Sequence, residues 1–215
     1  MMGKKQMFLI AFNHYGVEII VIIDNENKFI QVKIVYYGPA MSGKTTSIKY
    51  LFSHFNRKNE LESIENSVGR TLFFDFGVLV FNGEDWNLKF LIYTSTGQDF
   101  YASTRPATLN GVDGIIFVAD SQIERLAHNI RSWNELVLLM GDYIKKIPIV
   151  ISLNKSDLFL EKNIENYAFL KRIDYFSYEN LSIVKTSALT GSGVLECFYK
   201  LISFLFPELQ MINSK

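Results

Sequence analysis

The sequence predicts an α/β protein in which a mainly parallel β-sheet is flanked by helices. The run 114–119 is continuously apolar, as is typical of a strand buried on both faces of a parallel sheet, and the largely apolar run 147–153 predicts another such strand. A β-rich run at 29–37 leads through a glycine-bounded loop into a helix-like run at 44–56. Strands that alternate with helical segments favour a parallel sheet covered by those helices.

The composition fits a globular domain with a large core. The chain has 215 residues, 48% of them hydrophobic and 20% charged, which suits one domain with at most a small extension. The formal net charge of zero argues against a nucleic-acid-binding protein. The single cysteine, Cys197, excludes an intrachain disulfide and is typical of a reducing compartment, so we expect a cytoplasmic protein. The apolar run 7–12 is short for a transmembrane segment, and a peripheral membrane contact is left open.

The chain begins with two β-rich runs, 6–12 and 17–23, which turn signals separate from each other and from the run at 29–37. We expect them to form an extra β-meander packed on the edge of the sheet. The chain would then divide into an N-terminal β extension, residues 1–27, and a main domain, residues 28–215.

Residues 38–45 read GPAMSGKT and match the phosphate-binding pattern GxxxxGK[ST]. Between a strand and a helix, such a loop points backbone N–H groups and the positive end of the helix dipole at an anion. The Lys44 amine would reach the β- and γ-phosphates and stabilise charge during catalysis, and the Thr45 hydroxyl would ligate Mg²⁺. The residues expected to bind nucleotide here are Gly38, Ala40, Met41, Ser42, Gly43, Lys44, Thr45 and Thr46.

The segments after the phosphate loop predict a hairpin. Residues 57–70 are polar, so a mobile loop is expected. The run 71–81 is a predicted strand, 82–85 a turn, and 86–93 the returning strand. Gly97 and Gln98 follow that strand, where a glycine N–H can contact a γ-phosphate and a glutamine can orient water.

The second half of the chain predicts three more helices and a strand. Ser121-x-x-Glu124 resembles a capping box that opens a helix, and apolar residues then recur at helical spacing to Met140. A helix is expected at 159–176, a strand at 181–185, and an amphipathic helix at 191–206 that buries Cys197.

The buried run 147–153 ends in Asn154-Lys155-Ser156-Asp157. The Asp157 carboxylate can accept hydrogen bonds from N1–H and N2–H₂ of guanine, whereas adenine would leave it unpaired. The same tetrapeptide in isolation is also typical of a polar turn before a helix. A backbone N–H from the loop after the strand 181–185 would lie near the guanine O6. The residues expected to bind the base are Asn154, Lys155, Asp157, Ser187, Ala188 and Leu189.

The order of these motifs resembles the layout of Ras-like small GTPases, which are P-loop NTPases. The sequence is similar, more narrowly, to the MglA family of prokaryotic small GTPases, over about residues 30 to 206. The runs that carry this resemblance are 33–39, 43–46, 70–76, 111–114 and 119–125.

The resemblance implies roles for further residues. Thr45 and Thr71 would hold Mg²⁺, Gln98 would position the attacking water, and Arg70 would serve as an intrinsic arginine finger. The family has threonine in place of the usual aspartate of D-x-x-G, as Thr94 is here. Its members bind GTP and GDP and act as polarity or motility switches, with a Roadblock-fold activator of the MglB type.

The sequence departs from the family at two positions. Thr96 stands where the family has proline, and Ala40 stands where the loop usually has glycine. Because a side chain at that loop position crowds the glutamine and any inserted arginine, GTP hydrolysis is expected to be slow without an activator. Two alternatives stay open: a guanine-nucleotide-bound interaction module with little or no hydrolysis, and, more distantly, an ATP-using P-loop kinase. Arg105-Pro106 is open to interpretation as a partner surface or as a plain surface turn.

Overall fold

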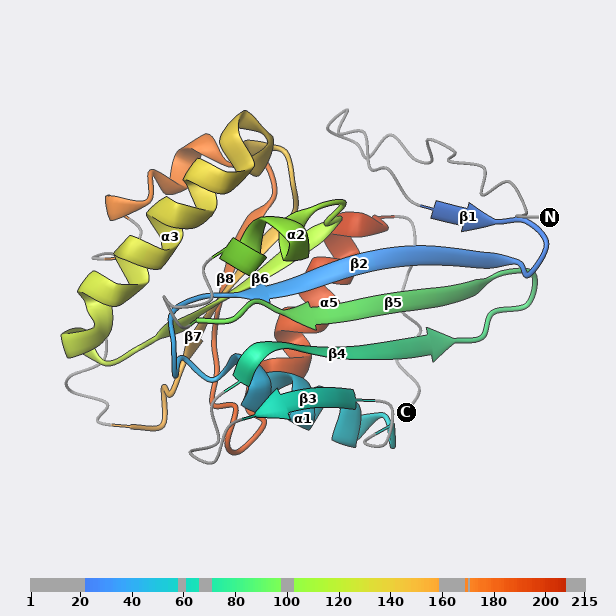
Figure 1. Cartoon of the computed structure of the whole chain (residues 1–215), viewed down its shortest axis with the longest axis horizontal. Helices are drawn as coiled ribbons and strands as arrows, with labels where there is room; N and C mark the ends of the chain where they lie inside the picture. Colours follow the sequence, from blue (N-terminus) through green and yellow to red (C-terminus); the bar gives the residue numbers. More distant parts are fainter. Residues whose placement is uncertain are drawn as a thin grey trace.

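The protein is built around one eight-stranded sheet with the strand order β3-β4-β5-β2-β6-β7-β8, and β1 pairs with β2 outside this path (Figure 1). The strands are β1 Ile22–Asp24, β2 Phe29–Tyr37, β3 Leu61–Glu65, β4 Thr71–Phe81, β5 Asn87–Thr94, β6 Gly114–Asp120, β7 Ile149–Asn154 and β8 Leu181–Lys185. This computed structural model describes residues 22–57, 61–65, 71–97, 103–158, 169 and 171–207.

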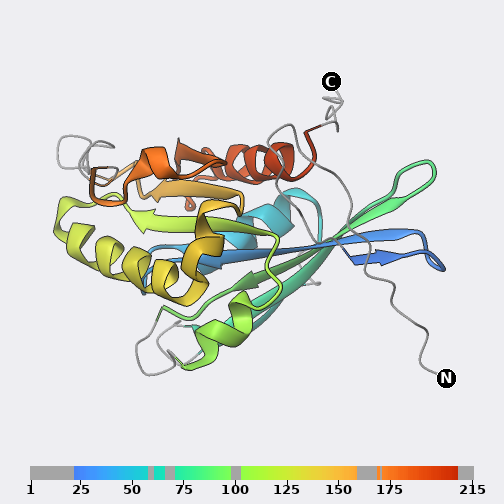
Figure 2. The ribbon, with the colours of Figure 1, turned by 90° about the horizontal axis from the view of Figure 1, so that it is seen from above.

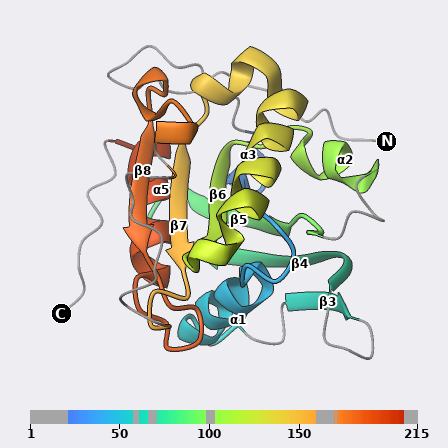
Figure 3. The ribbon, with the colours of Figure 1, turned by 90° about the vertical axis from the view of Figure 1, so that its left-hand side faces the viewer.

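The sheet is mainly parallel, as predicted. Strands β5, β2, β6, β7 and β8 pair in parallel, whereas β4 pairs antiparallel with both β5 and β3. Figure 3 shows the strands following one another from β8 to β3. The carboxyl ends of the five parallel strands therefore lie along one edge of the sheet, which is where ligands bind in open α/β folds.

Helices cover both faces of the sheet, α1 and α5 on one and α2 and α3 on the other (Figure 2). Each face has its own apolar cluster: Phe52 and Phe198 belong to the first, and Phe117 and Trp133 belong to the second, with ring centroids 5.0 Å apart. The α-helices are α1 Lys44–His54, α2 Arg105–Leu109, α3 Leu126–Met140 and α5 Val194–Leu205, and short 3₁₀ segments span Ile123–Arg125, Gly141–Lys145 and Tyr175–Ser177.

The prediction for α5 is confirmed, because Cys197 is 2% exposed and lies in the first apolar cluster. The predicted helix at 159–176 falls largely outside the described residues. Within the part of the chain that is described, no helix is long and apolar enough to cross a membrane.

An extra N-terminal strand is present, as predicted. Strand β1 pairs antiparallel with the first half of β2, in the register Ile23↔Ile30. Because β5 occupies one side of β2 along its length, β1 must lie on the side that β6 takes further along, from Ile34. At the end of the sheet where β1 lies, strands β2, β4 and β5 extend past the helices (Figures 1 and 2). The first run of the expected meander, 6–12, is not among the described residues, and the division of the chain at residue 27 stays a prediction.

Two local predictions are wrong. Residues 61–65, expected within a loop, form the edge strand β3, whose backbone pairs with β4 in the register Leu61↔Gly77. An edge strand needs few apolar side chains because its backbone hydrogen bonds hold it, so its polar composition is no obstacle. Ser121 does not cap a helix, since its hydroxyl donates to the Asn154 carbonyl oxygen at 2.6 Å and α3 begins only at Leu126.

Candidate functional site

The phosphate loop has the backbone that its two glycines allow. Gly38 and Gly43 have φ values of 143° and 103°, in the region that side chains disfavour. A Cβ atom on Gly38 would lie 2.3 Å from the Val118 carbonyl oxygen, and one on Gly43 would lie 2.1 Å from Asn154 Nδ2. Both glycines are therefore required by close packing as well as by conformation, and the loop they shape stands at the N-terminus of α1.

Lys44 lies inside this loop. Its side-chain amine donates to the carbonyl oxygens of Gly38 and Pro39, each at 2.8 Å, and the residue is 7% exposed. Burial, and to a smaller extent the positive charge of Arg105, lowers the pKa of Lys44 to about 7 against the opposing charge of the Asp75 carboxylate. A bound phosphate would supply the negative charge that favours the protonated amine.

Asp75 is a site residue that the sequence analysis did not single out. It lies on β4, is 0% exposed, and its Oδ2 accepts hydrogen bonds from the hydroxyls of Thr45, at 2.6 Å, and Thr94, at 2.9 Å. The neighbouring pair Phe76↔Tyr93 sets this register, which brings the aspartate beside Thr94. A charged residue inside an otherwise apolar strand was the available signal.

The oxygens around Asp75 fit a divalent cation. Mg²⁺ prefers oxygen ligands and takes one or two from protein side chains. The hydroxyl of Thr45 and the carboxylate of Asp75 provide such a pair at the base of the phosphate loop. The Asp75 carboxylate on β4 lies beside Thr94, the threonine that stands in place of the aspartate of D-x-x-G. Thr71 begins β4, four residues before Asp75, and its side chain is outside the described part of the structure.

Asn154 joins the phosphate loop to the base-binding loop. Its Nδ2 donates to the Ser42 carbonyl oxygen at 2.7 Å, and its Oδ1 accepts from the Ala188 N–H at 2.8 Å and from the Thr186 hydroxyl at 3.3 Å. All four residues are buried. Asn154 thus holds the two loops together, and its predicted contact with the base stays a prediction.

Lys155 and Asp157 have different surroundings. Lys155 has a φ of 64°, and its amine pairs with the Asp120 carboxylate at 2.7 Å. This ion pair holds the side chain beside β6. Asp157 is exposed, three residues beyond Asn154, so its carboxylate is open to a ligand at this edge. The other exposed residues of the predicted nucleotide set are Ala40, Met41, Thr46 and Leu189.

The loop after β5 touches the phosphate loop. A Cβ atom on Gly97 would lie 2.4 Å from the Ala40 backbone nitrogen and 2.7 Å from the Pro39 carbonyl carbon, so only glycine fits there. Gln98 and Arg70 lie outside the described residues, and their roles stay predictions. Arg105 is 5% exposed, so the interpretation of this residue as part of a plain surface turn is wrong.

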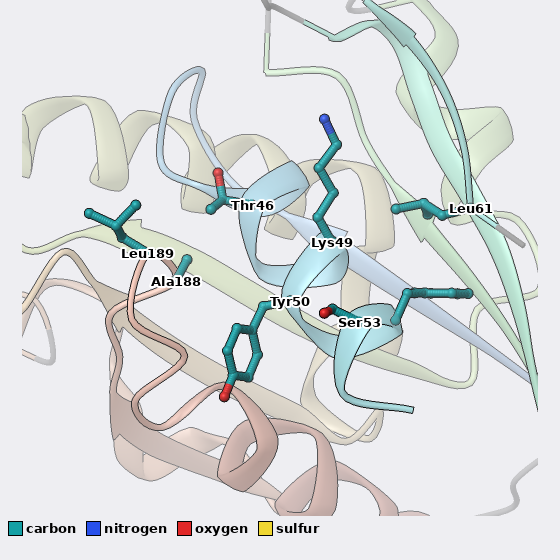
Figure 4. Close-up of a pocket in the computed structure, with 8 residues that line it drawn as sticks. Thr46, Lys49, Tyr50, Ser53, Leu61, Ala188 and Leu189 are labelled. Carbon is teal, nitrogen blue, oxygen red and sulfur yellow. The ribbon is translucent and has the colours of Figure 1, made fainter. Parts of the chain in front are cut away.

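A cavity of about 440 Å³ opens beside the phosphate loop, between α1, β3 and the loop after β8. Three residues of the predicted nucleotide set, Thr46, Ala188 and Leu189, line it together with Lys49, Tyr50, Phe52, Ser53 and Leu61 (Figure 4). Its volume is within the range of small-molecule pockets. One residue expected near the phosphate, Thr46, and two expected near the base, Ala188 and Leu189, therefore border one space. Lys44, Thr45 and Asp157 are not part of its lining.

The residues present fit a nucleoside phosphate with a divalent cation. The cradle that two glycines keep open stands at a helix N-terminus, with a buried amine inside it and an oxygen pair at its base. The buried Ser42 hydroxyl has no hydrogen-bond partner among the described residues, so a ligand in the loop could supply one.

Comparisons with known proteins agree with this geometry. The model of the Ras family matches residues 33–206. The mutual gliding-motility protein MglA of Myxococcus xanthus is 36% identical over 195 residues, which cover 87% of this chain and 97% of that protein. The ADP-ribosylation factor-like protein 6 of Caenorhabditis elegans is 31% identical, over 76% of this chain and 80% of that one.

A Rab protein is similar over most of its length as well. The Ras-related protein Rab-5A of Dictyostelium discoideum is 26% identical over 180 residues, 83% of each chain. The matched region contains the phosphate loop, the Gly97 loop and the Asn154 loop that the structure brings to one edge of the sheet. The chain therefore belongs to the Ras family and is an MglA-like small GTPase.

Proposed function

We propose that this protein is a molecular switch that binds GTP and GDP with Mg²⁺ and hydrolyses GTP. The observation that carries the proposal is the bonding of Asn154 to both Ser42 and Ala188. It makes the phosphate loop and the base loop one unit, with the exposed carboxylate of Asp157 beside them. Such a unit can recognise a triphosphate and a guanine in one molecule.

The residues would divide the chemistry of phosphoryl transfer to water. The Lys44 amine and the loop N–H groups would stabilise negative charge on the phosphates, in a site with little water. Thr45, Asp75 and Thr71 would hold Mg²⁺, which neutralises phosphate charge when bound. Gln98 would orient the attacking water, and the guanidinium of Arg70 would add positive charge in the transition state.

Base specificity tests the proposal directly. In competition for the nucleotide-free protein, GDP and GTP should bind far more tightly than ADP and ATP, because only guanine pairs with the Asp157 carboxylate. Asp157→Asn should shift the preference from guanine to xanthine nucleotides, since an amide matches the xanthine edge. ATP displacing GTP at similar affinity would overturn the guanine assignment and favour the kinase alternative.

Slow hydrolysis without an activator is the second part of the proposal. The Ala40 side chain sits in the loop that Gly97 touches, next to the position expected for the γ-phosphate. Ala40→Gly should therefore raise the single-turnover rate of GTP hydrolysis, because an arginine finger contributes about 10³–10⁵ in rate when it has room. An unchanged rate would exclude crowding by Ala40.

The regulatory setting is proposed from the similarity to MglA, whose name describes a gliding-motility protein. We expect a cytoplasmic switch in polarity or motility control, with a Roadblock-fold activator of the MglB type, no nucleic-acid partner, and membrane contact that is at most peripheral. The alternative is an interaction module with little or no hydrolysis. Phosphate release that is absent from both the wild type and Gln98→Leu, with or without such an activator, would favour the alternative.

A further inference from the structure

A buried arginine connects the loop after β5 to helix α3. Arg105, the first residue of α2, is 5% exposed. Its Nε donates to the Thr96 carbonyl oxygen at 2.9 Å, and its Nη1 pairs with the Glu135 carboxylate on α3. One guanidinium thus bridges a loop carbonyl and a helix carboxylate, a geometry that its fixed fork of donors permits.

The same carboxylate also reaches the phosphate loop. The Tyr37 hydroxyl donates to Glu135 Oε2 at 3.1 Å, and Tyr37 is the last residue of β2, immediately before Gly38. Burial, together with the charge of Glu135, raises the pKa of Tyr37 well above its usual range, so its hydroxyl keeps its proton and remains a donor. Glu135 is therefore the common acceptor for groups that border both phosphate-contacting loops.

The held carbonyl belongs to the residue before Gly97. Thr96 is 1% exposed, and Gly97 packs so closely on the Ala40 backbone that a methyl group would not fit. With the Thr96 carbonyl fixed on one side and the phosphate loop on the other, the direction of the Gly97 N–H is set by these contacts.

We propose that Arg105 is a positioning residue for GTP hydrolysis, acting with Glu135 and Tyr37 by fixing the Thr96 carbonyl so that the Gly97 N–H faces the γ-phosphate. This role rests on the proposed function. It differs from that of an arginine finger, because the guanidinium is bonded to protein groups and acts on the substrate only through the loop. Lysine cannot replace it, since a single ammonium lacks the two-sided planar fork.

The role predicts an effect on GTP that GDP does not share. The Gly97 N–H would contact the γ-phosphate, which GDP lacks, whereas the phosphate loop and the base loop would bind both nucleotides. A residue that only stabilised the fold would change both affinities alike. The ratio of the two affinities therefore separates positioning from general stability.

The test compares Arg105→Lys, Tyr37→Phe and, as control, Arg125→Ala, which removes an exposed arginine from the 3₁₀ segment before α3. Tyr37→Phe deletes one hydroxyl and keeps the ring, so this variant should fold. It therefore tests the same contacts even if Arg105→Lys does not fold. For each variant, the affinities for GDP and for a non-hydrolysable GTP analogue are measured by titration, with single-turnover hydrolysis of GTP.

In Arg105→Lys we expect GDP affinity within about twofold of wild type, GTP-analogue affinity lowered about tenfold, and hydrolysis slowed about 10²-fold, the usual effect of misplacing a catalytic group by about 1 Å. Tyr37→Phe should show the same pattern more weakly, and Arg125→Ala should match wild type. Equal losses for both nucleotides, or an unchanged affinity ratio and rate, would overturn the positioning role. Wild-type protein that bound neither nucleotide would overturn the proposed function, and this role with it.

Discussion

Replacing Asn154 by alanine tests the connection between the two nucleotide-binding loops. The substitution removes the partner of the Ser42 carbonyl and of the Ala188 N–H, both buried. A buried polar group left without a partner costs about 1–3 kcal/mol, so the two together should lower the free energy of unfolding by about 2–6 kcal/mol. That is a large share of the roughly 5–15 kcal/mol by which domains are stable.

The assay is urea unfolding of the nucleotide-free protein, followed by stopped-flow release of a fluorescent GDP. Asn154→Ala should shift the midpoint strongly and speed GDP release, because the base loop is no longer held to the phosphate loop. Asn134→Ala is the matched control: it makes the same change at an exposed position of α3, where alanine is the better helix former and the free energy should change by less than about 1 kcal/mol. A loss below about 1 kcal/mol in Asn154→Ala, or unchanged GDP release, would refute the reasoning.

Three further predictions concern the cation, the loop contact and pH. Asp75→Asn keeps the shape but removes the charge beside Thr45, so the Mg²⁺ concentration needed to slow GDP release should rise at least tenfold; an unchanged Mg²⁺ dependence would contradict the assignment. Gly97→Ala places a methyl group 2.4 Å from the Ala40 backbone, so it should weaken the GTP analogue more than GDP in the same titrations, and equal affinities for wild type and variant would count against the contact. Burial raises the pKa of Asp113 from 3.8 to about 7, against the opposing hydrogen bond from the Lys33 N–H and the charge of Lys33. Folding therefore favours the protonated acid, and its contribution to stability, present below about pH 4, should be lost as pH rises through about 7; urea midpoints of Asp113→Asn should lack this decline.

The local motifs could be predicted from the sequence because each depends on neighbouring residues. A glycine-bounded loop before Lys44 needs a particular backbone, and only a few residue types allow it. The largely apolar runs of β6 and β7 reflect burial on both faces, which local composition reveals. The strands other than β3, the helices α1, α3 and α5, and the order of the nucleotide motifs followed from such signals.

The contacts between distant segments could not be predicted in this way. Strand β3 depends on backbone pairing with β4, which a polar pentapeptide does not reveal. The Ser121 hydroxyl matched a capping pattern, yet the carbonyl of Asn154 on the adjacent strand was the stronger partner in the fold. In both cases a tertiary hydrogen bond prevailed over a local pattern.

The sequence by itself determined the fold class and the phosphate loop and marked Asp157 as the proposed guanine-binding carboxylate, because these signals lie in short runs of adjacent residues. Only the tertiary structure decided that Asp75 meets Thr45 across 30 positions and that Arg105 meets Glu135 across another 30. The packing of α1 beside β4, and of α2 and α3 on the other face of the sheet (Figure 2), brings these side chains together. A single charged residue in a strand or at the start of a helix carries no sign of its partner until the chain is folded, since the pairing is set by the tertiary fold rather than by its neighbours in sequence.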